Sequence, residues 1–215
     1  MEFLLKNIWL YLSNEHSYLR GTIMFNLLFA FLLGACTSNE KEIETAAVEE
    51  TAETASPIHW EECSYRIGEH ICNFELSANT GKMWSLYENY GRPMIIDLSA
   101  EWCSVCKNSA PFAEQFVQNW AEYDLMWITI LLENDQGEEP TAQDLVEWQN
   151  NYGSQDSIIL AGSRDLIDLS AENGFPLTSW PTFVILTDDL IIFHGVGGWS
   201  EDYLNQRLTE MLVLQ

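Results

Sequence analysis

Two cysteines stand two residues apart in the segment LSAEWCSVCKNSAPF, residues 98–112. Cys103 follows a tryptophan, and Cys106 lies where the first turn of a helix would place it. A C-x-x-C pair can form half of a metal site, a small structural disulfide or a redox-active dithiol. The residues around the pair distinguish these three possibilities.

The spacing of the other cysteines bears on the metal hypothesis. Cys63 and Cys72 enclose eight residues, which is wide for a zinc knuckle. Lys107 follows Cys106 where a covalent haem site would need histidine. Once Cys36 is assigned to another role, as below, four cysteines remain, an even number that suits an oxidising compartment. We therefore predict a structural disulfide between Cys63 and Cys72, which contributes about 2 to 3 kcal/mol.

The cysteine pair needs a strand before it and a helix after it. RPMIIDLSA, which ends at Ala100, is a short and almost continuously apolar run, as is typical of a buried central strand. Asp97 is the exception within that run. From Cys103 to about Ala121 the apolar residues follow helical spacing. Pro111 interrupts this helix, because an internal proline removes one hydrogen bond and usually kinks the helix.

The rest of the chain alternates strand patterns with helix patterns. The predicted elements are a hairpin that turns at 79–81, strands at 125–132 and 157–161, helices at 141–153 and 163–174, two strands within 181–198 and a helix at 200–212. Thr141 and Gly153 bound the first of these helices, and Ser200 caps the last. This order predicts an α/β fold with a mixed central sheet flanked by helices.

The charge balance excludes several classes of partner. The 215 residues include 33 acidic and 9 basic ones, for a formal net charge of -24. Such a chain repels phosphate backbones, so we expect no nucleic-acid binding.

The composition also limits the number of domains and of bound groups. With 47% apolar and 13% aromatic residues, the chain can build one buried domain plus appendages. His16, His59, His70 and His194 show no ligand spacing, so we expect neither a metal nor a cofactor.

The first residues have the pattern of an export signal. TIMFNLLFAFLL, residues 22–33, has the length of a signal-peptide core and is too short to span a bilayer. LGAC, residues 33–36, resembles the lipobox of bacterial lipoproteins, in which the cysteine, here Cys36, carries the lipid. An ordinary signal peptide followed by chance by a cysteine is the alternative. Translation could begin at Met1 or at Met24.

A tether follows the lipobox. Residues 36–57 are rich in Glu, Thr, Ala and Ser and contain no aromatic residue, so they cannot bury enough apolar surface to offset their ordering entropy. We predict a signal peptide at 1–35, a lipidated cysteine and flexible acidic tether at 36–57, and a folded domain at 58–215. The lipid would hold this domain on the periplasmic side of a bacterial membrane. Thr37 stands where aspartate favours inner-membrane retention in some bacteria, which favours the outer membrane.

The folded part resembles thioredoxins at several landmarks in the right order. MIIDLSAEWCSVCK, residues 94–107, resembles the segment that ends a central strand and opens the redox helix, with Asp97 six residues before the first cysteine. Pro111 stands where thioredoxins have the proline that kinks this helix. SWPTF, residues 179–183, resembles the cis-proline loop, with Pro181 as the cis residue. The resemblance implies a thioredoxin fold.

Two further segments resemble the TlpA/ResA branch, whose members are membrane-tethered, extracytoplasmic thiol-disulfide oxidoreductases. They are the leading hairpin within 74–93 and the helix-containing insertion at 132–157. Ser104 and Val105 stand between the cysteines, without the proline that many reductases have there. Trp180 precedes the cis-proline position, where a small or β-branched residue is common. These departures leave the direction of electron flow and the choice of client open.

Position and resemblance assign roles to three residues. Cys103, at the start of a helix, meets the positive end of the helix dipole, which favours a thiolate, so we predict that it is the nucleophile. Cys106, one turn further in, is the resolving thiol that expels the mixed disulfide. The resemblance gives Asp97 the transfer of the Cys106 proton. A hydrogen-bonded structural carboxylate is the alternative for Asp97.

Three further residues are candidates for client binding. The resemblance implies that Pro181, in the cis form, leaves backbone groups around it free to pair with an extended client chain. We predict Trp102 at a hydrophobic rim around the cysteines. For Trp180, rim and core packing are equally consistent with the sequence.

The resulting expectation is a lipid-anchored, extracytoplasmic enzyme that reduces protein disulfides through a Cys103/Cys106 dithiol. We expect protein thiol or disulfide clients, an upstream redox partner and a monomer. A disulfide oxidase or isomerase is the alternative within the same class. A tethered binding module with a permanent 103–106 disulfide is the alternative outside it.

Overall fold

The computed structural model describes residues 58, 60–153 and 156–213. The predicted signal peptide, the lipidation site Cys36 and the tether at 36–57 lie outside the described residues. Among the residues that are described, no helix is both long enough and apolar enough to cross a membrane.

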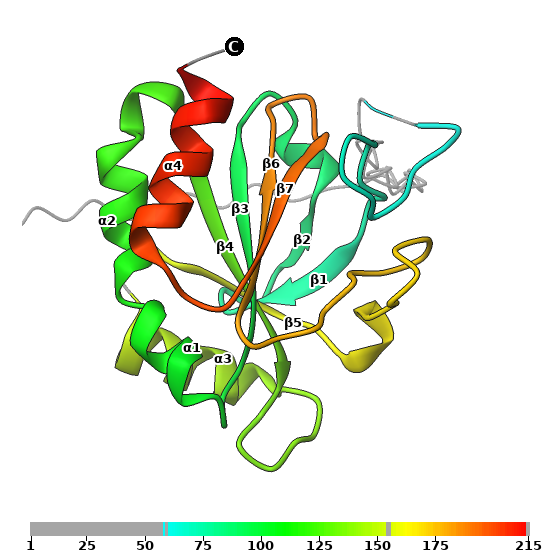
Figure 1. Ribbon diagram of the computed structural model, residues 1–215. Coiled ribbons are helices and arrows are strands. Elements are labelled where there is room, and N and C mark those ends of the chain that lie inside the picture. Colours follow the sequence, from blue (N-terminus) through cyan, green and yellow to red (C-terminus); the bar gives the residue numbers. More distant parts are fainter. Residues whose placement is uncertain (1–57, 59, 154–155, 214–215) are drawn as a thin grey trace, which may run out of the picture. The chain divides into compact units, whose positions relative to one another are not determined.

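A mixed sheet forms the centre of the folded domain (Figure 1). Its strands are β1 (Glu75–Ala78), β2 (Met83–Ser85), β3 (Met94–Ala100), β4 (Met126–Glu133), β5 (Ile158–Ala161), β6 (Thr182–Leu186) and β7 (Ile192–Gly197). They lie in the order β2-β1-β5-β4-β3-β6-β7. The β3, β4 and β5 strands are parallel to one another, whereas β6 is antiparallel to β3 and β1 is antiparallel to β5. The predicted leading hairpin is present as β1 and β2.

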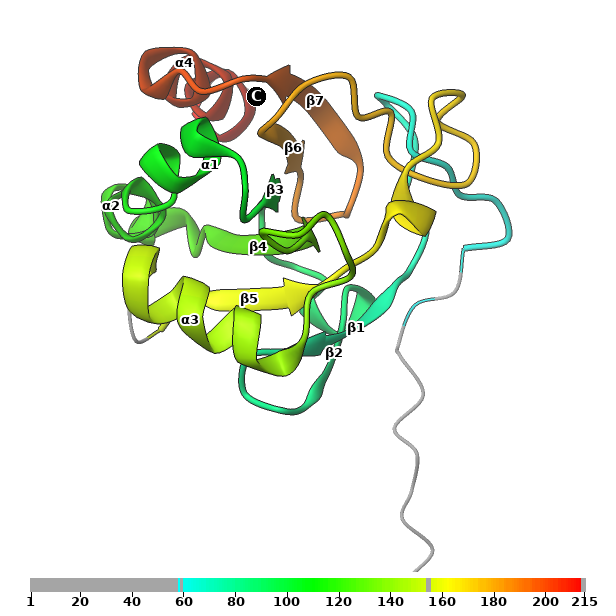
Figure 2. The ribbon, with the colours of Figure 1, turned by 90° about the horizontal axis from the view of Figure 1, so that it is seen from below.

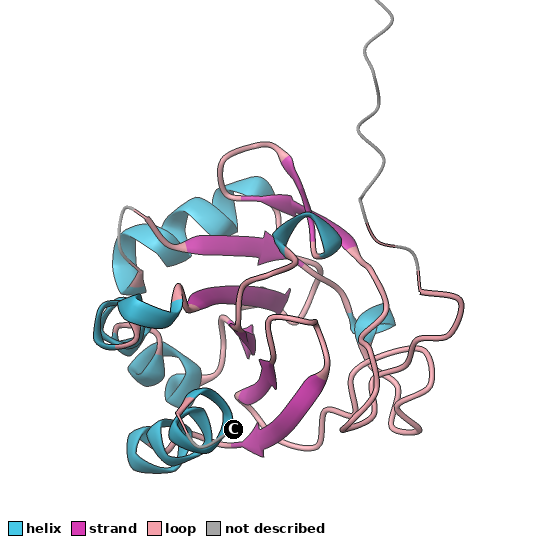
Figure 3. Ribbon diagram, turned by 90° about the horizontal axis from the view of Figure 1, so that it is seen from above, coloured by secondary structure: helices cyan, strands magenta, loops and turns pink. Residues whose placement is uncertain are grey.

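The helices gather on one face of the sheet, as Figures 2 and 3 show. They are α1 (Ser104–Ser109), α2 (Phe112–Asn119), α3 (Ala142–Tyr152) and α4 (Glu201–Leu212). The chain also forms the 3-10 turns η1 (Tyr87–Asn89), η2 (Ala121–Tyr123) and η3 (Arg164–Leu166), of which η1 and η3 pack on the other face. Because side chains alternate along a strand, Ile95 of β3 faces these helices, while Met94 and Ile96 pack on the other face. Loops cover that second face (Figure 3). This arrangement confirms the predicted fold class.

Local sequence explains the helix boundaries near the cysteines. The α1 helix ends at Ser109 and α2 begins at Phe112, so the helix is interrupted at Pro111 as expected. The helix in the predicted insertion is α3, and its first turn is closed by a capping box between Thr141 and Asp144. These boundaries fix where the cysteines and the loop after β4 lie.

The helix predicted at 163–174 is wrong. Only the short η3 forms there, and the chain then turns through a loop. The Asp168 carboxylate accepts hydrogen bonds from the backbone N–H groups of Ser170 and Asn173, and Ala171 has a left-handed φ of 57°. Such side-chain-to-backbone bonds compete with helical bonds for the same N–H groups. The helix-like spacing of apolar residues therefore reflects packing of a loop against the sheet.

The segment before β1 is closed by a disulfide between Cys63 and Cys72. Gly68 lies in the turn between them with a φ of 88°, a conformation that glycine adopts without strain. Backbone hydrogen bonds also hold the segment to the domain, and one runs from the Tyr65 N–H to the Ala171 carbonyl at 2.9 Å. The segment is thus held both by the disulfide and by the loops of the second face.

Replacing both Cys63 and Cys72 with alanine is expected to lower the free energy of unfolding by about 2 to 3 kcal/mol while the fold persists. The disulfide restricts the unfolded chain, whereas the backbone bonds that hold the segment remain in the variant. Urea unfolding of both proteins under the same non-reducing conditions measures the difference. An unchanged midpoint would contradict the stabilising role that we give this disulfide.

Candidate active site

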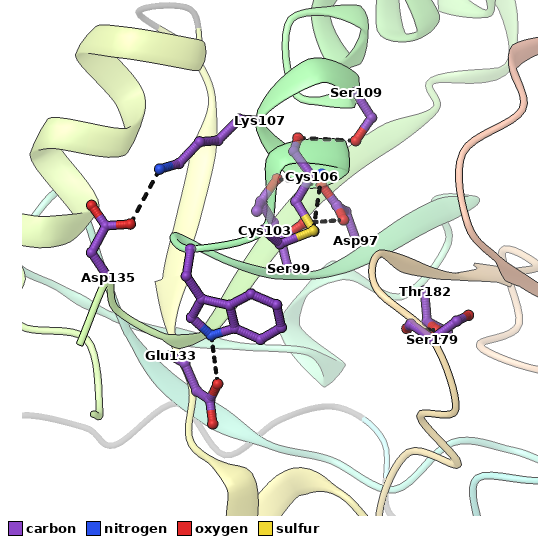
Figure 4. Close-up of a disulfide and its surroundings, with 12 residues drawn as sticks. Asp97, Ser99, Cys103, Cys106, Lys107, Ser109, Glu133, Asp135, Ser179 and Thr182 are labelled. Carbon is purple, nitrogen blue, oxygen red and sulfur yellow. Dashed lines mark hydrogen bonds and ion pairs between the residues drawn. A yellow bond between two sulfur atoms is a disulfide. The ribbon is translucent and has the colours of Figure 1, made fainter. Parts of the chain in front are cut away.

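Cys103 and Cys106 lie just after β3 and are joined by a disulfide (Figure 4). Cys103 is the N-cap residue of α1, and its sulfur accepts a hydrogen bond from the Cys106 backbone N–H at 3.1 Å. Cys103 is 5% exposed and Cys106 is fully buried. An N–H directed at the Cys103 sulfur stabilises negative charge on it. Because only Cys103 is partly exposed, its sulfur is the better placed of the two to react with another molecule.

Asp97, on β3, is fully buried, and Figure 4 shows its side chain directed toward the cysteine pair. Its carboxylate accepts hydrogen bonds from the Ser99 Oγ at 2.7 Å and from the Thr129 Oγ1 at 3.3 Å. Burial raises the pKa of Asp97 from 3.8 to about 7, because the charged form loses its hydration, and the two hydroxyl bonds oppose that rise. A carboxyl with this pKa can take up and release a proton at neutral pH.

The loop before β6 brings a cis peptide bond between Trp180 and Pro181 to the same region. The Pro181 carbonyl already accepts a hydrogen bond from the Gly198 N–H at 2.8 Å. The backbone N–H and C=O of Trp180, in contrast, have no hydrogen bond within the described part of the chain. The resemblance implied free backbone groups around Pro181 without naming the residue that carries them. Here the backbone groups without a partner are those of Trp180, and the Pro181 carbonyl is already bonded.

Two indoles stand beside the cysteines. Trp102 is 44% exposed, and Trp180 is half-buried. Their rings meet edge to face with centroids 5.3 Å apart. Trp102 is thus partly exposed and in contact with Trp180. Trp180 combines the two roles that the sequence left open, because it packs against the core and also touches Trp102.

Sequence reasoning missed two residues of this region. Glu133, the last residue of β4, accepts a hydrogen bond from the Trp102 Nε1 at 2.6 Å and forms an ion pair with Arg164 of η3. Glu133 is buried although it is charged, with 3% of the residue exposed. An acidic residue at the end of an otherwise apolar strand was the available signal in the sequence.

The other predicted residues lie apart from the cysteine pair or outside the residues that the structure describes. The Cys63–Cys72 disulfide belongs to the segment that covers the second face of the sheet. His70 stacks on Trp60, with ring centroids 3.7 Å apart, and the His194 Nε2 lies 3.0 Å from the Tyr203 hydroxyl. In the part of the chain that is described, no group of three or more His, Cys, Asp or Glu residues is arranged to hold a metal ion.

Neither a family model nor a curated protein matches the chain. Solved structures do match it. The exposed lipoprotein thioredoxin of Streptococcus pneumoniae is 24% identical, over 65% of this chain and 99% of that one, with a TM-score of 0.53. The dsbF protein of MTB is 19% identical, over 64% of this chain and 94% of that one, with a TM-score of 0.51. The thioredoxin domain of a thiol-disulfide oxidoreductase from Bacteroides vulgatus is 13% identical, over 68% and 98%, with a TM-score of 0.53.

The fold is that of thioredoxin. At these low identities the likeness establishes the fold, and the chemistry has to be argued from the residues of this chain. Within the thioredoxin fold, the end of β3, the start of α1 and the cis-proline loop bring together Asp97, Cys103, Cys106 and Trp180. The resemblance named Asp97, Cys103 and Cys106, whereas Trp180 stood out in the sequence as a departure from it. Trp180 packs against the cluster that contains the two cysteines.

Proposed function

We propose that the protein is a thiol-disulfide oxidoreductase that carries out thiol-disulfide exchange with protein clients through its Cys103–Cys106 pair. One observation carries the proposal. The Cys103 sulfur lies near the surface, the Cys106 sulfur is buried, and the buried Asp97 carboxyl, with a pKa of about 7, is directed toward the disulfide that joins them (Figure 4). Exchange needs one thiolate that can be reached and a second thiol that can be deprotonated inside the protein. These three residues supply both.

The reaction in the reducing direction follows from these positions. The Cys103 thiolate attacks one sulfur of the client disulfide, which forms a mixed disulfide and releases the first client thiolate. Asp97 then takes the proton of the Cys106 thiol, and the resulting thiolate attacks the Cys103 sulfur. This step forms the Cys103–Cys106 disulfide and releases the second client thiolate. Two electrons have moved to the client, and an upstream dithiol has to return the protein to the reduced state.

We also propose that the enzyme works outside the cytoplasm as a lipid-anchored, monomeric member of the TlpA/ResA type. The lipobox-like LGAC that ends at Cys36 supports the anchor, and the Cys63–Cys72 disulfide supports an oxidising compartment. A solved structure with the same fold is named an exposed lipoprotein thioredoxin. Thr37 after the lipobox cysteine favours the outer membrane.

Insulin reduction with dithiothreitol as the electron source tests the function. We expect the wild-type domain to accelerate it, and an inactive wild type would contradict the reductase hypothesis. The tethered binding module predicts instead that Cys103 stays unreactive toward alkylating reagents after mild reduction.

The reduction potential of the Cys103–Cys106 pair tests the direction of electron flow. We expect a value near that of thioredoxin, about -270 mV, because the protein is proposed to donate electrons. A value near about -120 mV would favour the oxidase alternative instead. Equilibration with glutathione buffers, followed by alkylation and mass analysis, measures it. The Cys63→Ala/Cys72→Ala variant serves as the matched control, since it leaves one disulfide to titrate among the described residues.

A further inference from the structure

Glu133 connects the rim of the cysteine pair to a loop far away in the sequence. One carboxylate oxygen accepts the indole N–H of Trp102, and the other pairs with the Arg164 guanidinium. The Glu133 side chain is 4% exposed, whereas that of Arg164 is 69% exposed. A buried carboxylate is costly unless its oxygens have partners, and here each of the two oxygens has one. This linked set of side chains gives a partly exposed tryptophan a fixed orientation.

The orientation of Trp102 determines the surface that it makes with Trp180. The two rings meet edge to face and stand beside Cys103, and we call this surface the indole wall. Trp180 also carries the unpaired backbone N–H and C=O described above. An extended client that pairs with those groups would bring a side chain next to its own cysteine onto the indole wall. Such a surface gains most free energy by covering an apolar side chain.

We propose that Glu133, braced by Arg164, is a positioning residue that holds Trp102 against Trp180 and so makes the enzyme prefer disulfides flanked by a large apolar side chain. This inference rests on the proposed function, and it adds a substrate class to it. Glu133 acts through Trp102 and does not touch the reacting sulfurs. Its effect therefore falls on KM more than on kcat.

Two peptide disulfides that differ only in the residue next to the attacked cysteine, leucine or serine, measure the preference. For the wild type we expect kcat/KM for the leucine peptide to exceed that for the serine peptide about tenfold, as one apolar contact supplies. Trp102→Phe keeps an aromatic ring but loses the N–H, and Glu133→Leu loses the acceptor. In both variants the ratio should fall toward one. Glu133→Gln should keep part of it, because an amide oxygen can still accept the indole N–H.

Two further comparisons separate positioning from general damage. Arg92→Ala removes an ion pair with Asp124 at the opposite end of the sheet, and we expect the wild-type ratio in this matched control. Hydrogen exchange of the Trp102 indole N–H, assigned by its loss in Trp102→Phe, should accelerate in Glu133→Leu. If Glu133→Leu does not fold, the ratio measured in Trp102→Phe tests the inference by itself. This variant should fold, because the Trp102 side chain is partly exposed.

The outcomes distinguish the inference from the proposed function. A wild type that reduces both peptides with a ratio near one overturns the apolar preference and leaves the oxidoreductase intact. A wild-type preference that persists in both Trp102→Phe and Glu133→Leu overturns the role of Glu133. A wild type that reduces neither peptide contradicts the proposed function itself, and the inference falls with it.

Discussion

Replacing Cys103 with serine should lower the rate of disulfide exchange by at least about a thousandfold, because the variant loses the attacking thiolate itself. Replacing Cys106 with serine should have a different consequence. The near-surface Cys103 can still attack a client, but no second thiolate is present to expel it. We expect Cys106→Ser to accumulate a covalent complex with the client.

Mass spectrometry under non-reducing conditions measures both results. Cys106→Ser should carry the mass of one client chain, which dithiothreitol releases, and Cys103→Ser should carry none. Serine differs from cysteine by one atom and should leave the packing around α1 intact, so circular dichroism serves as the folding control. If Cys103→Ser traps the client and Cys106→Ser does not, the assigned order of the two cysteines is reversed.

Strong local patterns made much of this structure predictable. The β3 strand is buried along its whole length, so its sequence is a nearly continuous apolar run. Pro111 has no backbone N–H to donate, and a break between α1 and α2 followed from its position. Asp97 stood out because a carboxyl inside an apolar strand has to be compensated. In each case a residue's own chemistry constrains its immediate surroundings.

The missed features depend on contacts between distant segments. Glu133 lies 31 residues from Trp102 and 31 residues from Arg164, and no local pattern brings the three together. The loop predicted as a helix has apolar residues at helical spacing. Ile167 instead pairs with Phe175 in an isolated bridge, while the Asp168 carboxylate binds nearby N–H groups. Tertiary pairing therefore overrode a local periodicity.

Replacing Asp97 with asparagine should stabilise the protein increasingly as the pH rises above about 4, and it should slow the chemistry. The pKa of Asp97 is about 7 in the folded state and 3.8 for an ordinary aspartate. Below about pH 4 the carboxyl is neutral in both the folded and the unfolded chain, and its contribution to stability is fully present. As the pH rises toward 7 the unfolded chain loses the proton first, so this contribution is lost, by about 4 kcal/mol in total.

Asparagine cannot ionise, so the variant should gain on the wild type by up to about 4 kcal/mol at pH 8 and by little at pH 4. Urea unfolding of the oxidised proteins at pH 4, 6 and 8 measures this difference. Asp124→Asn, which removes an exposed carboxylate at the other end of the sheet, controls for the loss of one negative charge. A wild type and an Asp97→Asn variant whose stabilities stay parallel across this range would contradict the buried titration.

The same substitution should slow the step that needs the carboxylate. Without Asp97, the Cys106 thiol has to lose its proton to water, so we expect release of the second client thiol to slow about a hundredfold at pH 7. Formation of the mixed disulfide by Cys103 should change much less, because the thiolate there is stabilised by the Cys106 N–H. Stopped-flow measurement of the two steps separates them. Equal slowing of both would assign Asp97 to structure, while a loss confined to the second step, together with the gain in stability, identifies it as the base.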